Sequence, residues 1–122
     1  FQMKKTLVQI SIIAAFMALC HVSATAQSLY FYLYNNTGKT FTKIYVSPSE
    51  SDSWGNNLIP TSYLYSGYQT KILIPATYGE TCYFDLKVIT TDGTSYKFTS
   101  LDICQLYRIT IHWNWTYTTE WE

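Results

Sequence analysis

The chain has 122 residues, of which 48% are hydrophobic and 18% aromatic, and it carries 8 basic and 8 acidic side chains. This length fits a single domain, and so high an aromatic content excludes an intrinsically disordered chain. A formal net charge of zero without a basic cluster argues against nucleic-acid binding, so no nucleic-acid partner is expected.

The N-terminal segment, residues 1–26, has the pattern of a secretory signal peptide. Lys4 and Lys5 precede a mostly apolar stretch over residues 7–19, and small residues typical of a cleavage site end the segment. The apolar stretch is shorter than the roughly 20 residues that cross a bilayer as a helix. We therefore expect a cleaved signal and one domain over residues 27–122 that is secreted, periplasmic or at the cell surface, with no membrane span. Retention of the segment is the alternative.

Strands are expected throughout the mature chain. Short runs rich in Tyr, Thr, Ile, Val and Phe recur between turn-forming residues, and no segment keeps a helical period of about 3.6 residues. The expected strands cover residues 29–34, 40–47, 68–74, 82–88, 95–99 and 107–113. Because one sheet of this size could not bury two apolar faces, the predicted fold is an all-β, small antiparallel β-sandwich of six or seven strands.

Turn-forming residues set the expected connections. Residues 35–38 and 92–93 should each close a hairpin, since Asn, Asp and Gly tolerate a positive φ. Residues 48–60 lack an apolar period and should form the main loop. A phase change in the second strand predicts a bulge near Lys43, and one helical turn is expected over residues 100–105.

Cleavage of the signal would leave Cys82 and Cys104 as the two cysteines of the mature chain. In an oxidising compartment a single pair of cysteines is more often a disulfide than a metal or redox site. We predict a Cys82–Cys104 disulfide, whose stabilising effect is about 3 kcal/mol in the chain-entropy model. No cofactor is expected.

A stripe of tyrosines is expected on the first strand. Tyr30, Tyr32 and Tyr34 alternate with apolar residues, so the three rings should share the face opposite the core. Tyrosine joins a flat apolar ring to a polar tip, and such a stripe can stack on a sugar or bury against another protein. Cover of the stripe by neighbouring strands or by the C-terminal tail is the alternative.

The chain ends in an aromatic segment that could continue the last strand to the C-terminus. Alternate positions carry apolar side chains, namely Ile109, Ile111, Trp113, Trp115, Tyr117 and Trp121. An isolated strand with this face would expose more apolar area than a soluble monomer usually shows in one patch. The tail should therefore pair within its own domain or add as a strand to a neighbouring molecule. Its position beyond the last complete strand slightly favours the neighbour, whereas pairing within the domain needs no partner.

The loop also contains side chains that resemble calcium ligands. Glu50, Asp52, Asn56 and Asn57 offer hard oxygen ligands within a short segment. Their spacing matches no EF-hand loop. We therefore expect polar side chains that satisfy backbone donors in a compact turn, with Trp54 folded back over the core, and a calcium site at Glu50 and Asp52 as the weaker alternative.

Catalytic chemistry has little support in the sequence. His112 is the one histidine left after cleavage, and no serine lies in a Gly-x-Ser-x-Gly elbow. Asp85 and Asp102 could form a glycosidase-like carboxylate pair, but Asp85 is expected to face Lys87 or Arg108 across strands. No catalytic residue is predicted.

Several short motifs resemble a set of small exported bacterial domains. They are Tyr45-Val46-Ser47-Pro48-Ser49, Asp52-Ser53-Trp54-Gly55 and Phe84-Asp85-Leu86-Lys87-Val88, followed by Asp92-Gly93 and Cys104. The resemblance covers about residues 29–111, and the tail from Trp113 onward lies outside it. That set, with its SPS…DxWG…DLKV…DG…C motifs, is itself uncharacterised. The resemblance therefore implies a β-sandwich of a secreted bacterial protein and no particular activity.

Together these patterns predict a secreted, non-enzymatic structural or assembly module that contacts other proteins through its aromatic C-terminal strand and sheet edges. The partner would be a second copy or another surface protein. A glycan- or ligand-binding module that uses exposed Tyr and Trp is the alternative, and a small hydrolase is a weaker one. The candidate binding residues are Tyr30, Tyr32, Tyr34, Trp113, Trp115, Tyr117 and Trp121.

Overall fold

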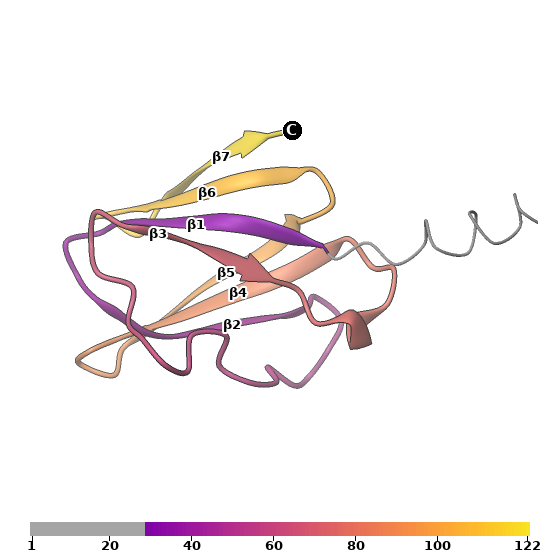
Figure 1. Cartoon of the computed structure of the whole chain (residues 1–122), viewed down its shortest axis with the longest axis horizontal. Helices are drawn as coiled ribbons and strands as arrows, with labels where there is room; N and C mark the ends of the chain where they lie inside the picture. Colours follow the sequence, from indigo (N-terminus) through magenta and orange to yellow (C-terminus); the bar gives the residue numbers. More distant parts are fainter. Residues whose placement is uncertain (1–28) are drawn as a thin grey trace, which may run out of the picture.

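This computed structural model describes residues 29–122, which contain seven strands and one short 3-10 helix (Figure 1). In chain order they are β1 (Tyr30–Asn36), β2 (Phe41–Pro48), β3 (Gln69–Leu73), η1 (Ala76–Tyr78), β4 (Tyr83–Thr90), β5 (Ser95–Asp102), β6 (Leu106–His112) and β7 (Tyr117–Trp121). The predicted signal segment, residues 1–26, lies outside the described residues. No helix within residues 29–122 is long and apolar enough to cross a membrane.

The strands form two layers, as expected for a small β-sandwich. One sheet has four strands in the order β3-β1-β6-β7, and the other has three in the order β2-β4-β5 (Figure 1). The predicted all-β fold class is confirmed. One pairing differs from the antiparallel arrangement expected, because β1 and β6 run parallel, with Tyr32 opposite Arg108.

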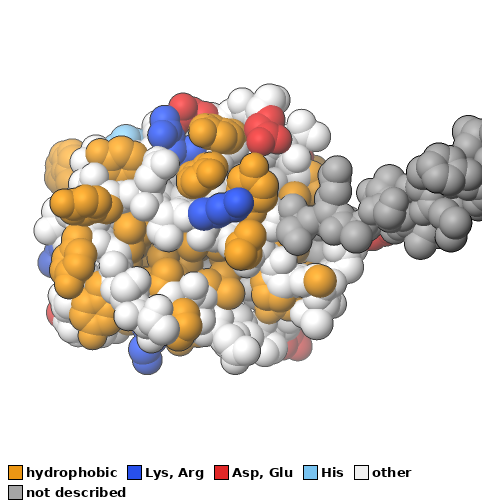
Figure 2. Space-filling view, viewed as in Figure 1, with side chains coloured by type: hydrophobic (Ala, Val, Ile, Leu, Met, Phe, Trp, Pro, Cys, Tyr) orange, Lys and Arg blue, Asp and Glu red, His pale blue; other side chains and the backbone are white. Residues whose placement is uncertain are grey.

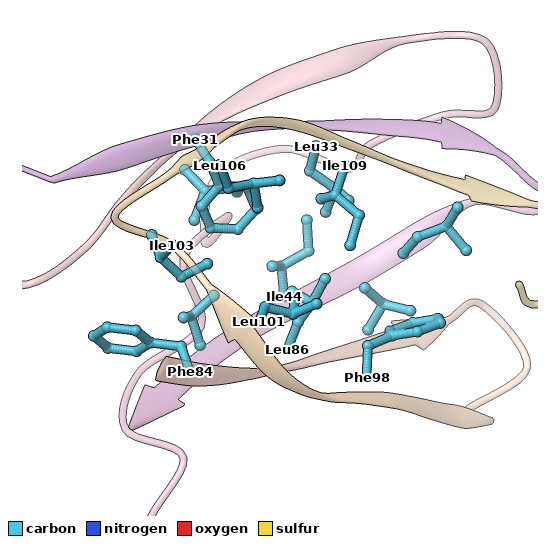
Figure 3. Packing of buried hydrophobic residues seen from close by; sticks show 14 of the residues in the cluster. Phe31, Leu33, Ile44, Phe84, Leu86, Phe98, Leu101, Ile103, Leu106 and Ile109 are labelled. Carbon is cyan, nitrogen blue, oxygen red and sulfur yellow. The ribbon is translucent and has the colours of Figure 1, made fainter. Parts of the chain in front are cut away.

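The core lies between the two layers because each strand turns alternate side chains inward. Phe31 and Leu33 of β1 point from the four-stranded sheet toward Phe84 and Leu86 of β4 (Figure 3). All four are at most 1% exposed. Full burial of a Leu or Phe side chain stabilises the folded state by about 1.5 to 3 kcal/mol, so this alternation dominates the stability of the sandwich.

One predicted hairpin and the predicted bulge are present, whereas the other predicted hairpin is not. The turn at residues 92–93 joins β4 and β5 as a hairpin, and the ladder of β2 shifts register between Phe41 and Lys43, as the predicted bulge requires. Residues 35–38 also turn the chain, with Gly38 at φ 83°. However, β1 and β2 belong to different sheets. This turn therefore carries the chain across the sandwich and closes no hairpin.

The predicted helical turn over residues 100–105 is wrong. β5 continues as far as Asp102, and only residues 103–105 form a hydrogen-bonded turn, in which the N–H of Gln105 donates to the carbonyl of Asp102 at 3.2 Å. Ser100 has φ 57° at an irregularity in the β4–β5 ladder. Residues 100–102, where the first half of a helical turn was expected, are therefore strand, with Ser100 in the left-handed region at the bulge.

Asp85 stabilises this irregularity. Its Oδ1 accepts a hydrogen bond from the backbone N–H of Ser100 at 3.0 Å and another from the Ser49 hydroxyl at 2.8 Å. The expectation that Asp85 faces Lys87 or Arg108 is therefore wrong. The carboxylate instead links the loop after β2 to the bulge in β5.

The predicted disulfide between Cys82 and Cys104 is present, with the two Cα atoms 5.2 Å apart. Beside it, the N–H of Ile103 donates to the carbonyl of Cys82 at 2.9 Å. The covalent bond therefore fastens the turn between β5 and β6 to the start of β4.

The aromatic tail does not continue β6 to the C-terminus, so that prediction is wrong. After His112 the chain turns back, with the N–H of Trp115 donating to the carbonyl of His112 at 2.9 Å and Trp115 at φ 64°. The returning segment is β7, which pairs antiparallel with β6 of the same chain. The turn also separates the four aromatic residues that the sequence placed on one face.

Candidate binding surfaces on the four-stranded sheet

The predicted tyrosine stripe lies on the outer face of the four-stranded sheet. Tyr30, Tyr32 and Tyr34 alternate with the buried Phe31 and Leu33. Tyr30 is 37% exposed, whereas Tyr32 and Tyr34 are half-buried among their neighbours. The expected orientation is therefore correct, and neighbouring strands cover part of the stripe.

A fourth tyrosine extends this surface. The β6–β7 ladder shifts register between Leu106 and Arg108, and Tyr107 lies at that irregularity. Its ring centroid is 5.4 Å from that of Tyr32, which is in turn 5.9 Å from that of Tyr30 in an edge-to-face contact. Sequence alternation missed Tyr107 because a bulge lets two neighbouring residues leave the regular pattern.

Charged side chains border these tyrosines. The Nζ of Lys71 lies 4.0 Å from the ring centroid of Tyr30. Arg108 makes a bidentate pair with Glu120, through Nε at 2.5 Å and Nη2 at 2.9 Å, and donates from Nη1 to Gln69 Oε1 at 3.1 Å. The hydrogen bonds that Arg108 donates to the Glu120 carboxylate raise the pKa of Arg108 above its ordinary value. This exposed pair ties β6 to β7 but stabilises the fold little, because water screens it.

The four aromatic residues of the tail have different surroundings. Trp113 is 77% exposed at the turn, whereas Trp115 packs on the core and stacks on Tyr96. Tyr117 is 41% exposed and touches Phe98 of β5 edge to face, at 5.6 Å between centroids. Trp121 is 56% exposed at the end of β7. Trp115 is therefore half-buried against the core, and the other three remain exposed.

Among residues 29–122, β7 is an edge strand with no strand on its second side, which is called its open side below (Figure 1). On the side toward β6, the carbonyl of Thr116 accepts from His112 at 2.9 Å, and the N–H of Glu122 donates to Gln105 at 3.1 Å. Backbone groups point to alternate sides along a strand. Tyr117, Thr119 and Trp121, which lie between those two positions at odd numbers, therefore direct their N–H and C=O groups to the open side.

The inner face of β7 is covered only in part. The four-stranded sheet has one strand more than the three-stranded sheet that packs on it. Tyr117 rests on Phe98 of the edge strand β5, and Trp121 stays more than half exposed. The sandwich is thus incomplete on the side where β5 and β7 both form edges.

Trp54 lies on the opposite layer from this site. The Nζ atoms of Lys87 and Lys97 approach its ring centroid to 4.7 and 5.5 Å, and Lys87 also lies 4.8 Å from the ring centroid of Tyr45. Tyr45, Lys87 and Lys97 are opposite one another across β2, β4 and β5. Trp54 therefore covers the outer face of the three-stranded sheet, and the expectation that it folds over the core is wrong.

The loop residues proposed as weaker calcium ligands do not come together with a third acidic group. Within residues 29–122, one group of three ligating side chains approaches closely, and it consists of Cys82, Asp102 and Cys104. Two of these form the disulfide. Glu50 and Asp52 are exposed and lie outside that group.

The residues considered for hydrolysis have structural partners. Nε2 of His112 lies 2.9 Å from the hydroxyl of Thr118, on the neighbouring strand. Asp85 holds the β5 bulge, and Asp102 lies beside the disulfide, opposite Tyr83 across the β4–β5 ladder. The structure does not assemble these side chains into a recognisable acid–base or nucleophile–base pair.

No family model matches the chain, and no curated protein or solved structure matches it.

Proposed function

We propose that this domain is a secreted, non-enzymatic assembly module in which the open edge of β7 pairs with β7 of a second copy. The observation that carries the proposal is the backbone of Tyr117, Thr119 and Trp121, which no strand of residues 29–122 pairs on the incomplete side of the sandwich. Unpaired N–H and C=O groups along a strand are a template for adding another strand. Main-chain hydrogen bonds would supply the affinity.

The register of such a pair follows from symmetry. In an antiparallel pair centred on Thr119, each Tyr117 lies opposite Trp121 of the second copy, and the three outward-facing backbone positions of both strands meet. A twofold interface uses the same patch on both subunits, which this register satisfies. Aromatic cross-strand pairs of this kind contribute roughly 0.2 to 1 kcal/mol each.

β7 carries few of the features that protect edge strands. It has no proline or lysine, and its one charged residue is Glu120, which Arg108 already neutralises. In the proposed register Glu120 lies opposite Thr118 of the second copy, so no like charges meet. Natural edges usually prevent pairing with a charge, a proline or a bulge. β7 has no proline, its register shift lies on the β6 side of the ladder, and its single charge is paired with Arg108, which supports a role in pairing.

Secretion and the lack of catalysis rest on separate observations. A disulfide is typical of proteins that fold in an oxidising compartment, and the N-terminal sequence pattern is that of an export signal. The side chains considered for hydrolysis are held by structural contacts. A glycan site on the Tyr30, Tyr32 and Tyr34 stripe has less support, because two of these rings are half-buried and Lys71 lies over the third.

The test compares two substitutions at the centre of the proposed pair. Thr119→Pro removes the outward-facing N–H without removing a bond to β6, and proline is tolerated on the open side of an edge strand. Thr119→Ala keeps that N–H and is the matched control. We expect sedimentation equilibrium to give a dimer for the natural protein and the alanine variant, and a monomer for the proline variant.

A natural protein that stays monomeric at high concentration, or a proline variant that still dimerises, would contradict the proposal. Trp121→Lys provides a second test if the proline variant does not fold. It keeps the backbone of β7 intact while placing a charge opposite Tyr117 of the second copy. We expect it to weaken the dimer as well, and an unchanged dimer would equally count against β7 pairing.

A further inference from the structure

A groove beside β3 is lined by residues that the proposed pairing of β7 does not use, since β3 and β7 are opposite edges of the same sheet. Two adjoining hollows of about 460 and 470 Å³ share part of their walls. Residues that line them include Ser62, Tyr63, Tyr65, Tyr68, Gln69 and Thr70. Figure 2 shows hydrophobic side chains exposed at the left of the molecule, where the segment that leads into β3 runs in Figure 1.

Three tyrosine rings dominate this groove. Tyr63, Tyr65 and Tyr68 are 54%, 57% and 68% exposed, and the rings of Tyr63 and Tyr65 lie 6.5 Å apart at 60° to one another. Three rings this exposed within one short segment add little to the stability of the fold. A cluster of exposed aromatic rings at a concave surface is typical of a recognition site.

The backbone that presents these rings is held firmly. Leu64 forms two hydrogen bonds with Phe41, at 2.9 and 3.0 Å, and its carbonyl also accepts from the side chain of the fully buried Asn35 at 3.0 Å. The backbone of Asn35 bonds Tyr68 at 3.0 Å and Gly67 at 2.7 Å. Because the segment is already ordered, a ligand would lose little affinity to the ordering of a loop.

We infer that this groove binds a neutral oligosaccharide. The face of a tyrosine ring carries partial negative charge, and the C–H groups on one face of a pyranose carry partial positive charge, so the two surfaces attract. Ser62 and Thr70 offer hydroxyls to the sugar. The oxygen Oε1 of Gln69 already accepts from Arg108 at 3.1 Å, which directs its amide NH₂ group to other acceptors.

The lack of charged side chains in the lining favours a neutral ligand over an acidic one. Every residue that lines the two hollows is uncharged. An acidic sugar or a phosphate would lose its hydration there without a cationic partner among the lining residues. Arg108, which lies behind Gln69, is already paired with Glu120. Both hollows are shallow and open, so an occupant would lie across the tyrosine rings and would not be enclosed. A peptide strand added to the edge of β3 is the competing occupant, and failure of every neutral hexasaccharide to bind would favour it.

The inference is tested by titrating the purified protein with neutral hexasaccharides of glucose, mannose, galactose and N-acetylglucosamine, and with oligogalacturonate as the acidic comparison. Binding is followed by calorimetry and by the amide NMR signals of residues 62–70. We expect at least one neutral hexasaccharide to bind, Tyr63→Ala and Tyr65→Ala to weaken it about tenfold each, and oligogalacturonate not to bind. Tyr83→Ala is the matched control, because Tyr83 is 57% exposed but does not line the groove.

Several results would overturn the inference. These are the binding of none of the neutral hexasaccharides at millimolar concentration, equal binding of oligogalacturonate, or equal loss of affinity in the Tyr83→Ala variant. Loss of binding in the Thr119→Pro variant would place the sugar at the β7 edge and would also contradict it. A sugar bound with unchanged affinity by monomer and dimer would support the groove whether or not β7 assembles.

Discussion

The ring of Trp115 lies flat on the ring of Tyr96, with centroids 3.4 Å apart and planes within 6° of parallel. Trp115 comes from the turn between β6 and β7, and Tyr96 comes from β5 in the other sheet. The same tryptophan ring lies 6.2 Å from the buried ring of Phe41 in β2. The stack therefore joins the two layers at the end of the sandwich where the tail turns back.

This contact leads to a prediction about Trp113 and Trp115, which are only two positions apart in the sequence. Trp115→Ala should lower the free energy of unfolding by about 3 kcal/mol, because a stacked, half-buried ring is lost from the core. Trp113→Ala is the control, since Trp113 is 77% exposed and should change stability by no more than about 0.5 kcal/mol. Urea unfolding of both variants measures the difference. Equal effects would contradict the different roles assigned to them.

The disulfide should contribute a large share of the stability of so small a domain. The double variant Cys82→Ser/Cys104→Ser should unfold with a free energy about 3 kcal/mol lower than the natural protein, because the unfolded chain regains the freedom of the closed loop. Chemical denaturation of both proteins without reductant measures this. Two free thiols in the natural protein by mass spectrometry would refute the premise.

Asp92 should make stability depend on pH in acid. The hydroxyl of Thr90 and the backbone N–H of Thr94 donate to its carboxylate and hold its pKa at about 2, below the ordinary 3.8. The folded state therefore binds this proton less readily than the unfolded state. The stabilising effect is fully present above pH 3.8 and is lost as the pH falls toward 2.

Two variants check this assignment. Asp92→Asn should remove that part of the acid dependence of the unfolding midpoint. Thr90→Val should raise the pKa of Asp92 toward its ordinary value, which an NMR titration of the carboxyl carbon would detect. An Asp92 pKa that stays near 2 without the Thr90 hydroxyl would show that the hydroxyl is not its main cause.

Gly55 should be sensitive to any added side chain. Its φ is 69°, and a Cβ atom there would lie 2.7 Å from the hydroxyl oxygen of Tyr78. Gly55→Ala should therefore cost about 1 to 3 kcal/mol from backbone strain and the clash together. Gly93→Ala carries the strain alone, because Gly93 has φ 83° and open space around it. Tyr78→Phe should recover part of the loss in Gly55→Ala but none in Gly93→Ala, and thermal unfolding would show this.

Local pattern predicted the strands well because the alternation of inward and outward residues is a property of each strand by itself. Phe31 and Leu33 are buried and the tyrosines between them face outward, as expected. Pairing was less predictable. Residues 35–38 indicate a reversal of the chain but cannot show that the next strand joins the other sheet, and nothing local marks the parallel contact of Tyr32 with Arg108.

Backbone irregularities explain why the positions of Trp115 and Tyr107 were not predicted, and the lack of a strand pattern explains the same for Tyr63 and Tyr65. Trp115 adopts a positive φ that bulky residues rarely adopt, so the turn in the tail had no glycine or proline to reveal it. The outward position of Tyr107 was not predicted because a bulge interrupts the alternation of inward and outward residues there. Tyr63 and Tyr65 lie in a segment without strand periodicity, and only the contacts of Asn35 and Phe41 show that this segment is ordered.

The parallel contact between β1 and β6 also determines when the domain can form during its synthesis. These strands are the two central members of the four-stranded sheet, yet β1 is the first strand of the described chain and β6 is the sixth of seven. Until β6 has been synthesised, β1 lacks one of its two neighbouring strands. Since folding slows as contacts become more distant in sequence, formation should be slow for a domain of this size, in the range of milliseconds to seconds.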